Sequence, residues 1–121
     1  MKPEIKQKWL NALRSGEYTQ SQERLRSDDG YCCLGVLCDL YIEENKGYDW
    51  SGDVDNYLFM SHNSDSYYEG TYLPYPVMEW ACLKDSNPIV IDNDGGRVAL
   101  SDLNDTGSSF NKIADYIEKQ L

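Results

Sequence analysis

The chain has 121 residues and carries 21 Asp and Glu against 11 Lys and Arg, which gives a formal net charge of −10. This length predicts one domain, residues 1–121, built around a single hydrophobic core. The acidic balance argues against duplex nucleic-acid binding, which draws its affinity from many Lys and Arg contacts to phosphates. No apolar run is long enough to cross a membrane, and the first residues lack the apolar stretch of a signal peptide. We therefore expect no membrane association and a location in the cytoplasm.

The charges are unevenly distributed along the chain. Residues 1–26 carry six Lys and Arg against three Glu, whereas residues 27–75 carry ten acids against Lys46 alone. The molecule should therefore be bipolar. Its small basic segment remains able to bind one compact anion.

A first helix is predicted over about residues 3–15. Pro3 suits a first-turn position, and Ile5, Trp9 and Leu13 recur at helical spacing. Gly16 then suits a left-handed C-cap. Residues 17–27 contain few apolar groups and predict either an edge strand or an ordered loop.

A second helix is predicted over about residues 31–44, with Asp28 and Asp29 as its N-terminal cap. It is apolar on nearly all sides, which is typical of a central, buried helix. Gly35 should allow a neighbouring segment to approach closely. Three of the four cysteines, Cys32, Cys33 and Cys38, lie in this helix, where disulfide geometry is poor, so we expect reduced thiols.

The remaining chain predicts smaller elements. Residues 45–72 are rich in Tyr, Ser, Asp and Gly and form either a functional loop or short strands. A short helix should follow Pro74 and end near Leu83. Two β-branched runs around a Gly-rich turn indicate a β-hairpin near residues 88–100. A last helix should begin after Ser108 or Ser109 acting as the N-cap.

These elements indicate an α+β fold: a single small domain with about four helices, one of them central and buried, and one β-hairpin. Its core should bury six large side chains together. They are Trp9, Leu34, Leu37, Leu40, Trp80 and Phe110.

Two segments carry a resemblance to a known family. The first runs from Leu25 to Cys38 and reads L-R-x-x-D-G-Y-C-C-L-G-V-L-C, and the second runs from Leu103 to Asp115 and reads L-N-D-x-G-x-x-F-x-x-I-A-D. Together with Lys8-Trp9 and Leu73-Pro74, they resemble a family of short, largely uncharacterised proteins of bacteriophages and prophages. The resemblance implies a phage or prophage origin and a role in early infection. It brings no catalytic residues.

The residues offer no catalytic constellation of their own. A Cys32 or Cys33 nucleophile would have only His62 as its base, and no Cys-x-x-Cys pair suggests zinc. The acidic groups at residues 49–55 and 92–94 lack the spacing of a calcium loop and fit solvated turns better. We therefore predict no catalytic residue, no metal and no cofactor.

Ten tyrosines and three tryptophans are more than the predicted core needs, and four arginines could pair with phosphate. One hypothesis is a binding protein that sequesters a nucleotide-like anionic ligand or immune messenger to counter host defence. The alternative is an acidic inhibitor of a host protein, acting as a nucleic-acid mimic or through a partner-blocking surface around residues 39–69. A thiol-dependent enzyme is a third, less favoured reading. The candidate ligand-binding residues are Arg24, Arg26, Tyr67, Tyr68, Tyr72 and Arg97.

Overall fold

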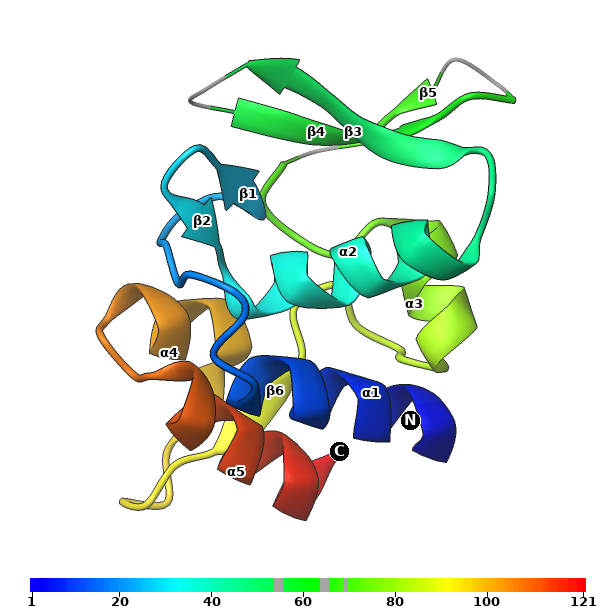
Figure 1. The fold of residues 1–121 in the computed structure, drawn as a ribbon. Coiled ribbons are helices and arrows are strands. Elements are labelled where there is room, and N and C mark those ends of the chain that lie inside the picture. The colour runs from blue at the N-terminus through cyan, green and yellow to red at the C-terminus, as the bar shows by residue number, and fades with distance from the viewer. Residues whose placement is uncertain (54–55, 64–65, 69) are drawn as a thin grey trace.

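The computed structural model describes residues 1–53, 56–63, 66–68 and 70–121, and these form five helices and three small antiparallel sheets (Figure 1). The predicted α+β class is confirmed. None of the helices among these residues has the length and apolar character needed to cross a lipid bilayer. In chain order the elements are α1 (Pro3–Arg14), β1 (Arg26–Ser27), β2 (Gly30–Tyr31), α2 (Cys33–Glu44), β3 (Tyr48–Asp53), β4 (Asn56–Ser61), β5 (Ser66–Tyr67), α3 (Tyr75–Ala81), β6 (Ile89–Ile91), β7 (Arg97–Ala99), α4 (Leu100–Asp105) and α5 (Phe110–Gln120).

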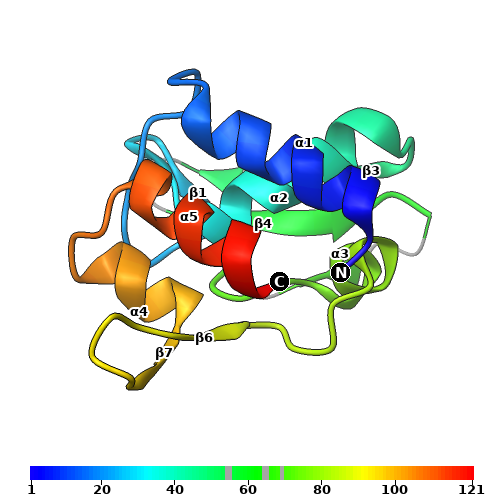
Figure 2. The same cartoon turned by 90° about the horizontal axis from the view of Figure 1, so that it is seen from below.

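Helix α2 lies in the middle of the molecule, as its apolar composition predicts. The sheet β3–β4–β5 lies over one side of α2, and α1 and α5 lie on the other (Figure 1). Viewed from below, α1 and α5 run beside each other and the two chain ends lie close together (Figure 2). Every residue of α2 from Cys33 to Cys38 is buried.

The start of α2 differs from the prediction. The helix begins at Cys33, because Gly30–Tyr31 pairs with Arg26–Ser27 as a short hairpin. Asp28 and Asp29 therefore lie in the hairpin turn, and the expected cap is wrong. The N-cap is Cys32, whose Sγ accepts a hydrogen bond from the Gly35 N–H at 3.4 Å.

The segment before this hairpin is partly strand-like and partly loop. The Tyr31 N–H donates to the Thr19 carbonyl and the Ser21 N–H donates to the Tyr31 carbonyl, both at 2.8 Å. Leu25 is fully buried against α2, and a Cβ on Gly35 would lie 1.7 Å from the Leu25 carbonyl oxygen. The close approach expected at Gly35 is thus confirmed.

Residues 45–72 form short strands rather than a structureless loop, within the part of this segment that the structure describes. β4 is the central strand, paired with β3 over its whole length and with β5 at its end. Phe59 of β4 is fully buried beneath the sheet and contacts the rings of Tyr41, Tyr48, Trp50 and Tyr68. Part of the tyrosine surplus therefore fills the layer between the sheet and α2.

The C-terminal third follows the prediction apart from one added helix. β6 and β7 form the expected hairpin, and Ser109 caps α5 by accepting a hydrogen bond from the Lys112 N–H. The short helix α4, directly after β7, was not predicted. In the core, Trp9, Leu34, Leu37 and Phe110 are buried as expected, whereas Leu40 and Trp80 are only half-buried.

Candidate functional site

Arg26 packs its guanidinium among three aromatic rings. Its central carbon lies 4.6 Å from the ring centre of Tyr57, 5.2 Å from that of Tyr31 and 5.8 Å from that of Trp50. These distances are those of cation–π contacts. Arg26 thereby connects the β1–β2 hairpin to β3 and β4. These contacts indicate a structural role for Arg26 rather than the predicted role in binding an anion.

A half-buried carboxylate completes this aromatic group from the α2 side. Asp39 accepts hydrogen bonds from Trp50 Nε1 at 3.0 Å and from the Tyr18 hydroxyl at 2.7 Å. Burial and the Asp39 carboxylate together raise the pKa of Tyr18 well above its usual range. Tyr18 therefore stays a neutral donor at physiological pH, which keeps Asp39 bonded and the rings in place.

The predicted arginine and tyrosine segments do meet, but not around a shared anion cavity. The Leu25 N–H donates to the Gly70 carbonyl at 2.6 Å, which places residues 24–26 beside residues 70–72. Tyr72, 42% exposed, faces a cavity of about 70 Å³ lined by Glu23, Asp102 and Asp105. Three carboxylates around so small a space would repel an anion.

The other predicted site residues are dispersed. Arg24 is exposed beside the β1–β2 hairpin, whereas Arg97 lies on β7, paired with Ile91 in the separate β6–β7 hairpin. Tyr67 is 59% exposed on β5, and Tyr68 packs its ring 5.6 Å from Phe59. The structure thus brings Arg26 close to aromatic rings, but to Tyr31, Trp50 and Tyr57 rather than to Tyr67, Tyr68 or Tyr72.

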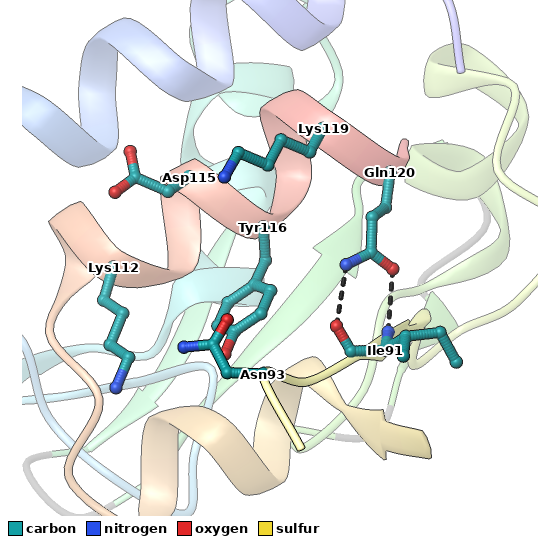
Figure 3. Close-up of a pocket in the computed structure, with 7 residues that line it drawn as sticks. All are labelled: Ile91, Asn93, Lys112, Asp115, Tyr116, Lys119 and Gln120. Carbon is teal, nitrogen blue, oxygen red and sulfur yellow. Dashed lines mark hydrogen bonds between the residues drawn. The ribbon is translucent and has the colours of Figure 1, made fainter. Parts of the chain in front are cut away.

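A cavity of about 270 Å³ lies between α5 and the β6–β7 hairpin, and we call it the lysine cavity (Figure 3). Lys112 and Lys119 project from α5 on either side of the buried Tyr116, and Asn93 approaches from the hairpin turn. Asp115 also borders this cavity, but its carboxylate is held by Arg14 at 2.7 Å. Lysine ammonium groups beside a tyrosine and an amide provide donors for a compact anion.

One wall of the lysine cavity is fixed by an unusual side-chain contact. Gln120 Oε1 accepts from the Ile91 N–H at 2.7 Å, and Gln120 Nε2 donates to the Ile91 carbonyl at 2.8 Å (Figure 3). The amide group therefore pairs with the outer edge of β6 as a neighbouring strand would.

A larger cavity, about 510 Å³, opens between the C-terminal end of α2, the start of β3, and α3, and we call it the aromatic cavity. The Tyr41 ring lies 4.9 Å from the Tyr48 ring and 5.2 Å from the Trp80 ring, at interplanar angles of 74° and 80°. Tyr41 is buried, whereas Tyr75 at the rim is 67% exposed. Three aromatic rings packed edge to face, those of Tyr41, Tyr48 and Trp80, therefore line the cavity.

The cysteines do not form a nucleophilic site. All four are free; Cys32, Cys33 and Cys38 are buried and Cys82 is exposed. Burial raises the pKa of Cys32 to about 11 and raises those of Cys33 and Cys38 well above their ordinary value. These three thiols stay protonated at neutral pH, which disfavours attack by a thiolate. Within the described residues, no group of three or more His, Cys, Asp or Glu side chains could hold a metal ion.

Sequence reasoning missed the aromatic cavity because its residues were divided between other roles. Trp80 is one of the six predicted core side chains, Tyr41 lies within the predicted buried helix, and Tyr48 and Tyr75 belong to the tyrosines that the predicted core does not need. A usable signal was the spacing of Tyr75 and Glu79, four residues apart on one helical face after a proline start. In the structure the Glu79 carboxylate raises the pKa of Tyr75, as a neighbouring negative charge does.

The segments that carry the family resemblance meet in the interior. Asn104 is fully buried, and its Oδ1 accepts from Gln20 Nε2 at 2.9 Å and from the Cys33 N–H at 3.2 Å. Its Nδ2 donates to the Ser21 carbonyl at 2.7 Å. The Asp105 carboxylate next to it accepts from the Glu23 N–H at 2.9 Å, where Glu23 has a left-handed φ of 74°. The second motif therefore anchors residues 20–23 and contacts the first motif at Cys33.

Comparison with known proteins gives one relationship. No curated protein and no solved structure matches the chain. The model of a protein family described as a domain of unknown function, DUF8296, matches residues 1–121, the whole of the chain. The protein therefore belongs to the DUF8296 family.

Proposed function

We propose that this is a small phage-type protein that acts in the host cytoplasm by binding and blocking a basic surface of a host protein. The observation that carries the proposal is the segregation of charge. Residues 27–75, which we call the acidic region, carry ten acids against one lysine, although the rest of the chain is nearly neutral. Complementary charge speeds encounter with a basic partner and selects it over acidic proteins.

The described acids of this region support such a surface. Asp28 and Asp29 are exposed at the β1–β2 turn, and Glu43 and Asp49 are exposed on α2 and β3. Each of these elements adjoins the sheet β3–β4–β5, on one side of the molecule (Figure 1). The same side presents the exposed ring of Tyr67, and tyrosine is among the residues that contribute most to protein interfaces.

Charge reversal tests this proposal. The immobilised protein is used to isolate partners from a bacterial lysate, and cross-linking with mass spectrometry locates the contact. The test variant combines Asp29→Lys, Glu43→Lys and Asp49→Lys. The control combines Glu17→Lys, Asp94→Lys and Asp102→Lys, which changes the net charge equally at exposed positions outside the acidic region.

We expect a basic partner whose cross-links fall in the acidic region and whose retention decreases with salt. The test variant should lose this partner and the control should keep it. Equal loss in both variants would mean that only overall charge matters. Cross-links confined to α1 or α5 would place the interface elsewhere and contradict the proposal.

A second candidate function is sequestration of a small nucleotide-like anion, and the lysine cavity is the observation that favours it. A bound ligand raises the stability of the folded state in proportion to the logarithm of its concentration over Kd. Thermal unfolding with AMP or inorganic phosphate should therefore show a rising Tm. Lys112→Met with Lys119→Met should abolish the rise, whereas Lys46→Met, at an exposed site in the α2–β3 turn, should preserve it.

A further inference from the structure

We infer that the aromatic cavity binds an organic cation, the guanidinium or ammonium group of a basic side chain. The inference rests on the proposed function for the source of the cation, a basic partner protein. It goes further by assigning the contact to one cavity and one chemistry.

The arrangement of the rings is the first argument. Electron density on an aromatic ring face attracts a cation. Tyr41, Tyr48, Tyr75 and Trp80 all line the cavity, and Tyr41 packs edge to face with both Tyr48 and Trp80. The volume of about 510 Å³ exceeds what one side-chain head group needs, so the stem of the side chain can enter as well.

The backbone and charges around the cavity are the second argument. Asn45, the C-cap of α2, lines the cavity, so the negative end of this 12-residue helix lies beside the rings. Glu79 supplies a full negative charge at the wall. The Glu79 carboxylate raises the pKa of Tyr75, whose exposed ring lies at the rim of the cavity.

The positive charge of Lys2 opposes cation binding, so removing it should change the affinity in the opposite direction to the other variants. Lys2 also lines the cavity, and its side chain is exposed. The position of its backbone is fixed separately, since the Lys2 N–H donates to the Ala81 carbonyl at 2.9 Å. Removing the Lys2 ammonium should therefore strengthen cation binding without moving the chain.

The test compares two small probes of nearly the same shape. N-acetyl-arginine amide carries a guanidinium, whereas N-acetyl-citrulline amide carries a neutral urea group in its place. Each is titrated into the intact protein while the Trp80 indole signal is followed by NMR. We expect saturable shifts with the arginine probe and none with the citrulline probe.

Variants then assign the binding to the cavity. Glu79→Gln and Tyr75→Ala should each weaken binding of the arginine probe at least about threefold, since each removes one attraction of the cation–π or ion-pair type. Lys2→Ala should tighten it. Tyr67→Ala, which removes an exposed tyrosine on β5 outside the cavity, should leave it unchanged.

Equal shifts with both probes would overturn the inference, because the cavity would then be an apolar slot without preference for charge. The absence of any shift with arginine would overturn it too. Neither result concerns the acids Asp29, Glu43 and Asp49, which do not line the cavity and whose salt-dependent partner is tested by charge reversal. Conversely, arginine binding with no such partner would leave the cavity assigned and the proposed function refuted.

Discussion

At the scale of single residues, the buried Asn104 joins separate segments of the chain through hydrogen bonds that an apolar side chain could not make. Its amide reaches the Gln20 side chain, the Ser21 carbonyl and the Cys33 N–H at once. Two of these partners lie in an irregular segment that has no helix or sheet of its own to satisfy its polar groups. A buried, fully bonded amide of this kind fixes a single arrangement of the segments around it.

Replacing Asn104 with Ala should therefore lower the free energy of unfolding by at least about 2 kcal/mol, because it leaves buried backbone groups without partners. Urea denaturation measures the change. Asn111→Ala, at an exposed position of α5, is the matched control and should change the value by less than about 0.5 kcal/mol. A small effect at Asn104 would mean that water replaces its hydrogen bonds.

Gly35 also contributes to stability as a single residue, but for a steric reason. Alanine normally favours a helix over glycine by about 1 kcal/mol. Here the added Cβ would lie 1.7 Å from the Leu25 carbonyl oxygen, so α2 or the segment across from it must move. We expect Gly35→Ala to destabilise the protein by about 2 kcal/mol or more, measured by urea denaturation.

A control for this prediction is Gly96→Ala in the β6–β7 turn. There a Cβ would meet only the Asp92 carboxylate, at 3.3 Å, and the backbone does not require a positive φ. The effect should be small. If Gly35→Ala proved equally mild, the packing of residue 25 against α2 would be looser than the structure shows.

At the scale of elements, the two-residue strands β1 and β2 are too short to be stable alone. Arg26 compensates by spanning from the hairpin to Trp50 of β3 and Tyr57 of β4. The contact combines cation–π attraction with burial of the arginine stem.

We therefore expect Arg26→Ala to cost about 1–2 kcal/mol of stability and to speed amide hydrogen exchange in the β1–β2 hairpin. Arg24→Ala, two residues away and exposed, should cost less than about 0.5 kcal/mol. If the two variants behaved alike, the ring contacts of Arg26 would contribute nothing to the fold.

The elements that sequence reasoning predicted are those with a strong local signal. The periodic apolar positions of α1 and α5 and the Gly-rich turn between β6 and β7 are visible within a few residues. Other strands depend on pairing between segments rather than on a periodic pattern. β2 replaces the first helical turn because Tyr31 pairs with Thr19 and Ser21, and β3 and β4 are recognisable only once they pair with each other.

For the candidate site too, sequence reasoning identified residue types but not the tertiary contacts that they make. Patterning indicated spare tyrosines and scarce arginines as candidate ligand-binding residues. It did not show that Arg26 would turn to Tyr31 and Trp50, nor that Tyr41 and Trp80 would form a cavity from two separate helices. Side-chain direction at a half-buried position depends on tertiary packing.

At the scale of the whole molecule, three buried thiols make stability depend on alkaline pH. The folded state raises the pKa of Cys32, Cys33 and Cys38 above the ordinary value of 9.0. Below that value both states hold the protons and the stability is complete. Above it, the unfolded chain releases protons that the folded chain keeps, so the free energy of unfolding falls as pH rises.

Urea denaturation at a series of pH values between 7 and 10 should show this fall. Cys38→Ala should reduce the slope toward pH 10, since one fully ionised thiol contributes about 1.4 kcal/mol per pH unit. The comparison concerns slopes, so the lower starting stability of the variant does not affect it. Thiolate absorbance at pH 9.5 from a folded Cys82→Ser variant, which keeps only the three buried thiols, would show that these are more accessible than the structure indicates.

The pairing of Gln120 with Ile91 has a consequence for solubility at high concentration. Ile89 and Ile91 are 45% and 44% exposed on a strand whose outer edge is paired, among the residues that the structure describes, only with this one amide. Exposed apolar strands with open edges recruit strands of other molecules. Gln120→Ala should therefore leave a dilute protein monomeric and folded, yet cause mass to increase with concentration in analytical ultracentrifugation. Adding Ile91→Lys should restore a single species. If the Gln120→Ala variant stayed monomeric at high concentration, the Gln120 side chain would not be what prevents association through the edge of β6.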